Sequence, residues 1–422
     1  MKDSGIEWIK EIPAEWSVAR GKSILKLQKR SPESYEEVIT CFRDGEVTQR
    51  KNRREDGFTF SDKEIGYQGI HTGDLVIHGM DGFAGAIGIS DSDGKGSPVL
   101  VVCTSEQNQR YLMYYLRMLA TQNVFVALST GIRERSCDLR WNKIAELLFP
   151  IPPMDVQDKI TAFLDNKCSK VDGVIARQQE AIEKLKDYKL SVIAEAVTKG
   201  LNLNVPMKDS GIEWIGQIPA HWYMHKFCWD YSAMLGKMLD AKRVKGNNLH
   251  PYIKNADVQW FSINNKDLDE MDFDESETER YSVRPGDLMI CEGGEIGKCA
   301  IVPADFPKGV YYQKALHRVR KRNEKSGNIE FLSYLMFVMA KNNCFNTSPE
   351  KATIAHLPGD ALAQLRIPAP PFEEQCGIVN YLNEKCQSIE NAINLRAKVV
   401  HRLTEYKKSL IYEVVTGKRE VE

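Results

Sequence analysis

The chain has 422 residues, about three times the size of a usual domain, so we expect at least two folding units. Hydrophobic residues make up 42% of the chain and charged residues 27%, a composition that excludes disordered and fibrous proteins. The 57 Lys and Arg residues nearly balance the 58 Asp and Glu residues, which leaves a net charge of −1. A polyanionic partner would therefore be held by local clusters of positive charge, and a uniformly basic nucleic-acid binder is excluded.

The sequence carries no membrane or secretion signal. The opening MKDSGIEWIK lacks the basic start and apolar stretch of a signal peptide, and no window approaches the roughly 18 apolar residues of a membrane helix. We therefore expect a cytoplasmic protein with no membrane partner. The ten cysteines include no C-x-x-C pair and the eight histidines show no ligand spacing, so we expect neither disulfides nor a metal site.

An internal repeat organises the chain. The opening MKDSGIEWIKEIPAEW returns at residues 207–222 as MKDSGIEWIGQIPAHW, with 13 of 16 positions identical at an offset of 206. A second pair of segments, residues 150–198 and 368–416, matches without gaps at 17 of 49 positions and an offset of 218. Because a repeat of this kind reflects a repeated structural unit, we expect the same architecture twice.

The stretches between the shared segments, residues 17–149 and 223–367, hardly resemble each other. Both contain Gly-Asp-Leu before strand-like apolar residues, at 73–75 and 286–288, and both contain an apolar helical run, YLMYYLRMLA in the first and FLSYLMFVMA in the second. The sequence therefore predicts an α+β fold in which two variable globes alternate with two constant helices.

Each constant helix is predicted to begin after a proline pair, at 152–153 or 370–371, since proline cannot continue a helix backwards. Apolar residues then recur at alternating steps of three and four, which is the heptad seam of a coiled coil. The seam positions that we expect to form the spacer are Ile160, Leu164, Ile175, Gln178, Ile182, Leu185, Ile378, Leu382, Ile393, Arg396, Val400 and Leu403.

A helix of this length cannot bury a one-sided stripe alone, and the nearest matching stripe is its own repeat. Chain order then predicts an antiparallel coiled coil. Gln178 and Arg396 occupy the same seam position in the two copies, and we expect them to meet near its middle, where a polar pair can select register. The alternative is two surface helices, each packed on its own globe. The repeat is also nearly circular, so we expect a pseudo-twofold molecule with adjacent termini.

No catalytic constellation is found in the sequence. An amino-methyltransferase needs a [DNS]PP[YFW] loop and a Gly-rich turn, but APPF places Ala369 where a hydrogen-bond acceptor belongs. Gly297-Lys298 lacks the other residues of a phosphate-binding P-loop. Asp287, Glu295 and Lys298 are mis-spaced for a metal-dependent nuclease. We therefore expect a protein that is not an enzyme and binds no cofactor.

Basic clusters in the two globes are the remaining candidates for function. Such clusters can neutralise phosphates, and Arg can read guanine edges through two hydrogen bonds. The alternative for each cluster is a solvated face, and the acidic run at 267–279 is expected to be a solvated loop. The predicted DNA contacts are Arg50, Lys51, Arg53, Arg54, Arg133, Arg135, Arg140, Lys242, Arg243, Lys245, Arg318, Arg320, Thr353 and His356.

This layout resembles the specificity subunits of type I restriction-modification systems. The resemblance rests on the twice-used start G-I-E-W-I-x-x-I-P-x-x-W and on the P-P-x-x-x-Q-x-x-I entry into each helix, with Gln157 in the first copy and Gln375 in the second. It also rests on the helix ends Tyr188-Lys189 and Tyr406-Lys407. The match covers the whole chain.

The resemblance implies that each globe is a target recognition domain for half of a bipartite site in double-stranded DNA. It implies a helical spacer that docks two modification (methyltransferase) subunits, which restriction subunits with ATP-driven translocase and nuclease activity join. The methyl donor, ATP and magnesium then belong to those partners. The division that follows has target recognition domains at 1–153 and 207–371, a central helix with linker at 154–206, and a distal helix at 372–422.

Two other interpretations are considered. The first is a protein scaffold with two interaction domains on a coiled-coil strut, which would bind proteins and not DNA. The second is a DNA methyltransferase in its own right, which Ala369 and the missing Gly-rich turn oppose.

Overall fold

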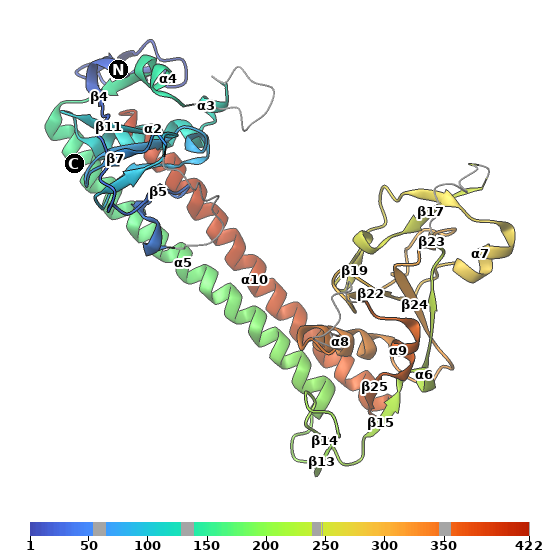
Figure 1. The fold of residues 1–422 in the computed structure, drawn as a ribbon. Coiled ribbons are helices and arrows are strands. Elements are labelled where there is room, and N and C mark those ends of the chain that lie inside the picture. The colour runs from blue at the N-terminus through green and yellow to red at the C-terminus, as the bar shows by residue number, and fades with distance from the viewer. Residues whose placement is uncertain (54–64, 128–138, 239–245, 247, 346–355, 422) are drawn as a thin grey trace. The chain divides into compact units, whose positions relative to one another are not determined.

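The computed structural model describes residues 1–53, 65–127, 139–238, 246, 248–345 and 356–421. The chain forms two compact units, here called unit 1 (residues 1–180 with 396–422) and unit 2 (residues 181–395). Each unit holds one globe and part of each of two long helices, α5 (Met154–Lys199) and α10 (Phe372–Val415) (Figure 1). The boundary between the units thus runs through both helices, whereas the division drawn from the sequence keeps the helices apart from the globes.

The globe of unit 1 is built on a four-stranded antiparallel sheet, whose strands lie in the order β4 (Leu25–Leu27), β11 (Leu100–Ser105), β8 (Leu75–His78) and β9 (Ile87–Ile89). Because side chains alternate along a strand, its two faces enter different cores. Leu75 and Ile77 pack with the predicted apolar helix, α2 (Gln109–Thr121). Val76 packs on the other side with Ile39 and Val47. Both faces of the sheet are therefore covered.

Unit 2 repeats this arrangement, although the two sequences differ. The strands lie in the order β16 (Tyr231–Leu235), β24 (Leu316–Lys321), β21 (Leu288–Cys291) and β22 (Cys299–Ile301), and all neighbours are antiparallel. Leu288 and Ile290 pack with the second predicted apolar helix, α8 (Ile329–Lys341). Met289 and Cys291 face a separate core. The faint correspondence between the globes therefore reflects a shared fold.

Smaller elements complete each globe. In unit 1 they are β1 (Lys2–Asp3), β2 (Glu11–Ile12), β3 (Ser17–Arg20), α1 (Gly21–Ile24), β5 (Ile39–Cys41), β6 (Val47–Gln49), β7 (Gln68–Ile70), β10 (Gly94–Gly96), α3 (Val124–Ala127), α4 (Trp141–Glu146) and β12 (Leu148–Ile151). In unit 2 they are β13 (Met207–Asp209), β14 (Gln217–Pro219), β15 (Tyr223–Lys226), α6 (Phe227–Asp230), β17 (Leu249–Ile253), β18 (Val258–Gln259), β19 (Ser262–Ile263), β20 (Glu270–Asp272), α7 (Glu275–Tyr281), β23 (Tyr311–Tyr312), α9 (Gly359–Gln364) and β25 (Arg366–Ala369).

The shared Gly-Asp-Leu motif places a buried aspartate in the turn before the central strand of each sheet. In unit 1, Asp74 accepts a hydrogen bond from the amide of His71 and forms an ion pair with Arg30. In unit 2, Asp287 accepts from the amide of Arg284 and pairs with Arg320. Because an unpaired buried carboxylate is costly, each globe supplies an arginine to this aspartate, although from a different strand or loop.

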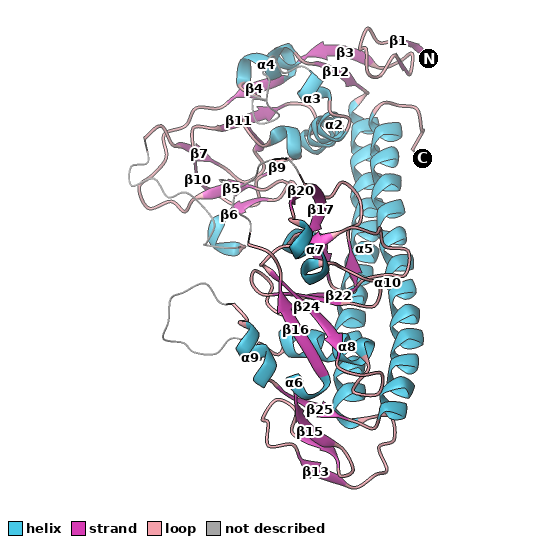
Figure 2. Cartoon of the chain, turned by 90° about the vertical axis from the view of Figure 1, so that its right-hand side faces the viewer, coloured by secondary structure: helices cyan, strands magenta, loops and turns pink. Residues whose placement is uncertain are grey.

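Helices α5 and α10 lie side by side and run antiparallel (Figure 1, Figure 2). In unit 1, Lys407 donates to the carboxylate of Asp172 at 2.6 and 2.7 Å, and in unit 2, Lys189 donates to Glu390 at 2.5 Å. These two pairs occupy equivalent positions at the offset of 218. The α+β class and the paired helices are confirmed, and the alternative in which each helix packs only on its own globe is wrong.

The end of each long helix packs against the repeated opening segment. In unit 1, Val414 and Val415 at the end of α10 share a core with Ile6 and Ile9. In unit 2, Val197 at the end of α5 shares a core with residues of the second opening segment, Ile215, Ile218 and Trp222. The two ends of the described chain therefore meet in one core, as the near-circular repeat predicts (Figure 1).

The opening segments also allow a test of backbone strain. Lys10 has a left-handed backbone with φ 69°, and the equivalent residue in unit 2, Gly216, has φ 67°. A side chain added at Gly216 would meet no atom within 4 Å, so only the backbone conformation distinguishes the two sites. For a residue other than glycine, the left-handed backbone destabilises the folded state by about 1–2 kcal/mol. Glycine avoids this strain but increases the conformational entropy of the unfolded chain, which offsets part of the gain in stability.

We therefore expect Lys10→Gly to raise the free energy of local unfolding of the segment at 1–16 by about 0.5–1 kcal/mol. Gly216→Lys should lower the free energy of local unfolding of the segment at 207–222 by a similar amount. Hydrogen exchange of the amides of Ser4 and Ser210, which donate to the carbonyls of Lys10 and Gly216, measures each effect. Equal protection in both variants and the wild type would contradict this explanation.

Candidate nucleic-acid interface

The first predicted basic cluster follows strand β6, partly in a short 3₁₀ helix over Arg50–Asn52. Arg50 donates through Nε to the hydroxyl of Thr40 at 3.3 Å, and Lys51 lies 3.0 Å from the carboxylate of Glu37. The guanidinium of Arg53 is placed 4.3 Å above the centre of the Phe42 ring. The cluster is therefore held in place by packing and polar contacts.

Arg53 is the most firmly held of these side chains. It forms ion pairs with Asp44 at 2.5 Å and Glu46 at 3.1 Å. Burial is the largest single effect and would raise the pKa of Asp44, but the hydrogen bonds from Arg53 and from the Glu46 amide, together with the nearby positive charge, lower that pKa overall. Asp44 thus stays ionised and offsets much of the charge that the sequence suggests for this cluster.

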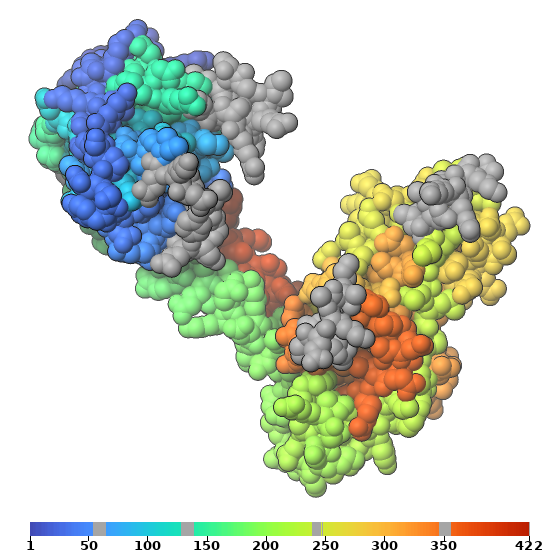
Figure 3. Space-filling view, viewed as in Figure 1, coloured from blue at the N-terminus to red at the C-terminus, as the bar shows by residue number. Residues whose placement is uncertain are grey.

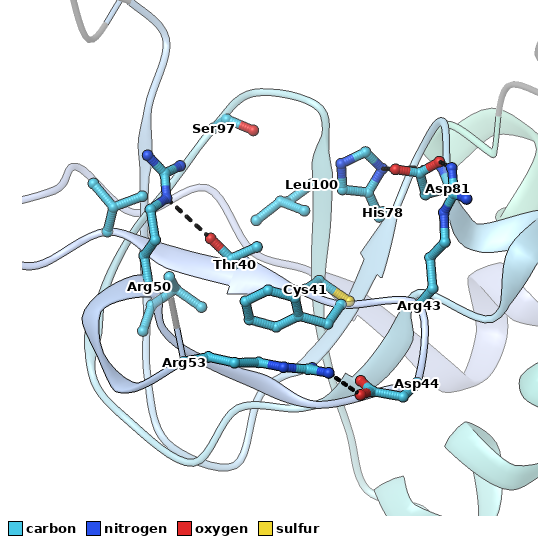
Figure 4. Close-up of a pocket in the computed structure, with 13 residues that line it drawn as sticks. Thr40, Cys41, Arg43, Asp44, Arg50, Arg53, His78, Asp81, Ser97 and Leu100 are labelled. Carbon is cyan, nitrogen blue, oxygen red and sulfur yellow. Dashed lines mark hydrogen bonds and ion pairs between the residues drawn. The ribbon is translucent and has the colours of Figure 1, made fainter. Parts of the chain in front are cut away.

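A cavity of about 870 Å³ opens beside this cluster, and Figure 4 shows the side chains around it. Arg43, Arg50 and Arg53 line it, and so do Thr40, Ser97 and the two carboxylates Asp44 and Asp81. Three guanidinium groups around one hollow can form several hydrogen bonds to phosphates or base edges. This cavity is therefore a candidate for a nucleic-acid contact in unit 1.

The sequence analysis missed two residues of this cavity, Arg43 and His78. Arg43 forms an ion pair with Asp81 at 2.8 Å, and the amide of Asp81 donates to Nδ1 of His78 at 2.9 Å. Burial lowers the pKa of His78, so the ring is neutral at neutral pH and accepts this bond. Each is a single basic residue in its own segment, so no run of positive charge marks either one.

The thiol of Cys41 also lines the cavity. Burial raises the pKa of the Cys41 thiol to about 12, which leaves no thiolate to act as a nucleophile at neutral pH. Across the described residues, no group of three or more His, Cys, Asp or Glu side chains is placed to hold a metal ion.

None of the helices in the described ranges is long and apolar enough to cross a membrane.

In unit 2, the predicted contacts Arg318 and Arg320 lie on strand β24 and are used within the globe. Arg318 is only 6% exposed and donates to the carbonyls of Arg280 and Ser282, at the end of helix α7. Arg320 pairs with the buried carboxylate of Asp287. These contacts favour a structural role for both arginines, and their assignment to DNA stays a prediction.

The structure places two further predicted residues on the surface. Arg140 is exposed at the residue before helix α4, and His356 is exposed beside Gly293, with which it forms an isolated bridge. The other predicted DNA contacts lie outside the described residues and stay predictions: Arg54, Arg133, Arg135, Lys242, Arg243, Lys245 and Thr353.

Comparison with known proteins agrees with this fold. The family model described as "Type I restriction modification DNA specificity domain" matches residues 235–398. A putative type I restriction enzyme specificity subunit, MjaX of Methanocaldococcus jannaschii, is 22% identical over 85% of this chain and 76% of its own length. The EcoKI specificity subunit of Escherichia coli is 23% identical over 70% of this chain and 63% of its own length.

Two solved structures share the fold across nearly the whole chain. One comes from work on complex assembly and conformational transition of the type I R-M system, with a TM-score of 0.74, 16% identity, and coverage of 97% of this chain and 100% of that one. The other is the HsdS subunit of Thermoanaerobacter tengcongensis, with a TM-score of 0.52, 16% identity, and coverage of 97% and 98%.

Two α+β globes with paired long helices are the fold that this chain shares with the HsdS subunit described above. Residues 235–398 match the type I DNA specificity domain, and the chain is similar over most of its length to the specificity subunits of type I restriction-modification systems. It is the DNA-recognition component of such a complex and is not itself catalytic.

The basic cluster of unit 1 gives a prediction about DNA affinity. We expect Arg50→Gln with Lys51→Gln to weaken DNA binding by the assembled complex, because two cations beside the cavity are lost. If both contact phosphates, the slope of log K against log salt falls in magnitude by about 2, since each phosphate contact contributes roughly 0.9.

Lys26→Gln is the matched control, because Lys26 is an exposed lysine of the same globe that also pairs with a glutamate, Glu106. We expect this control to keep the wild-type slope. Fluorescence anisotropy across a salt series measures both variants. A double variant with the wild-type affinity and slope would contradict the assignment of this cluster to DNA.

Proposed function

We propose that each globe reads one half of a bipartite site in double-stranded DNA, while α5 and α10 keep the two readers a fixed distance apart. The observation that carries this proposal is the repetition of one frame around dissimilar surfaces. The sheet order and the helix behind it occur twice, but their basic groups are placed differently. Two unlike readers on equivalent frames suit a site with two unlike halves.

The helices are proposed to dock two modification subunits. Tyr188 and Tyr406, which are equivalent in the repeat, are 48% and 47% exposed, and Val399 is also exposed on α10. Part of α5, in light green, is uncovered on the face seen in Figure 3. Exposed aromatic and aliphatic side chains on a helix suit a protein partner, and a doubled surface suits two copies of it.

Restriction subunits with ATP-driven translocase and nuclease activity are proposed to join this core. The modification subunits would supply the site for the methyl donor, and the restriction subunits the sites for ATP and magnesium. Because the substrate is the host and invading DNA, we place the complex in the cytoplasm.

The seam between the helices is proposed to set the spacer between the half-sites. Arg396 donates to the side-chain oxygen of Gln178 at 2.7 Å. These residues are each other's counterparts at the offset of 218, so an antiparallel pair brings them together only at the centre of the repeat. A polar pair at that point would disfavour every register shifted by a heptad, because a shift leaves both groups against apolar neighbours.

Shortening the helices tests this proposal. Removal of one heptad from α5 together with the equivalent heptad from α10 shortens the pair by about 10.5 Å at 1.5 Å per residue. We expect the spacer in the methylated motif to shorten by about three base pairs at 3.4 Å each, with both half-sites unchanged. Methylome sequencing measures the motif, and an unchanged spacer would overturn the role of the helices.

A further inference from the structure

A buried glutamine joins each globe to the start of its long helix. In unit 1, Asn108 caps helix α2 by accepting from the amides of Arg110 and Tyr111. The backbone N–H of Asn108 donates to Oε1 of Gln157 at 3.0 Å, and Nε2 of Gln157 donates to the carbonyl of Pro152 at 2.9 Å. The Gln157 side chain is fully buried and therefore links the cap of the globe helix to the first turn of α5.

The same joint is built again in unit 2 from the equivalent residues. Asn328 caps helix α8, and its backbone N–H donates to Oε1 of Gln375 at 2.9 Å. Nε2 of Gln375 donates to the carbonyl of Pro370 at 2.8 Å. The glutamine and the proline belong to the constant segments, whereas the asparagine belongs to the variable globe.

The contacts next to the joint differ between the two units. In unit 1, Arg110 forms an ion pair with Asp165 at 2.8 Å. In unit 2, the position of Arg110 is taken by Glu330, which accepts a hydrogen bond from Asn383 at 3.0 Å. The globe helix can therefore change its charge and partner one turn away, while the asparagine–glutamine contact keeps the same atoms and nearly the same length.

The joint is suited to fixing an orientation. The core around it, which includes Ile160 and Leu164 of α5, holds the parts together but tolerates small rotations because apolar contacts are not directional. The hydrogen bonds of a buried amide are directional, and Gln157 also donates through Nε2 to Oε1 of Gln107 at 2.7 Å. A rotation that breaks these bonds leaves buried polar groups unpaired. The globe helix is thus held in one position against the first turn of α5.

We propose that Gln157 and Gln375 are positioning residues that set the angle of each globe on its helix, and so restrict the complex to one spacer length between the half-sites. This proposal rests on the proposed function. It also explains how globes of different sequence can join the same kind of helix. The backbone N–H of the asparagine that caps the globe helix donates to the glutamine in both units, whatever bases the globe reads.

Gln157→Met tests the proposal, because methionine has nearly the shape of glutamine but can form none of these hydrogen bonds. The full chain is co-expressed with its modification subunits, and the host DNA is sequenced for methylation. We expect both half-sites to keep their bases, while methylation of sites with a spacer one base pair longer or shorter rises about tenfold over the wild type. Gln375→Met is expected to have the same effect.

Gln179→Met, the same substitution at an exposed position of α5, is the control and should keep the wild-type spacer. Gln375→Met makes the same change at the equivalent joint of unit 2, and it decides the matter if Gln157→Met does not fold. A single spacer length in the variants, or altered bases within a half-site, would overturn the positioning role. If the wild-type complex yields no bipartite motif, the proposed function fails instead.

Discussion

The antiparallel register of α5 and α10 is the constraint on which the rest of the molecule depends. Because the helical segments are an internal repeat, each seam residue has a counterpart 218 positions away. Only one register brings equivalent ion pairs together in both units. Asp172 with Lys407 and Glu390 with Lys189 satisfy that register. Gln178 and Arg396, which are each other's counterparts, meet in it. Polar contacts on the seam thus specify what an apolar stripe alone would leave free to slide.

The structure separates the parts of the chain that repeat from the parts that vary. Buried polar groups repeat: the aspartate before each central strand has an arginine partner, and a glutamine supports the cap of each globe helix. Groups on the surface differ, as the arginine-lined cavity of unit 1 shows. Because the buried polar groups have the same partners in both units, the surface residues of each globe can differ without changing the fold. The proposed recognition of two unlike half-sites requires such a difference.

Much of the fold could be predicted from the sequence, because repeats and helical periodicity can be detected in the order of the residues alone. The long helices, the apolar helices α2 and α8 and the strand after each Gly-Asp-Leu motif are where the sequence places them. The candidate site was harder to predict. Arg318 and Arg320 belong to a basic run, HRVRKR at 317–322, but they contact the end of α7 and Asp287, which lie some 30 to 40 residues away in the chain. Charge counting cannot reveal partners at that separation.

The central claim is that one chain reads two unlike half-sites at a fixed separation. Comparing the methylomes of the host with and without this gene tests it most directly. The account predicts that one motif loses its methylation, and that this motif has two unlike halves separated by a spacer of constant length and variable sequence. Loss of no motif, or loss of a motif that is one continuous sequence, would contradict it.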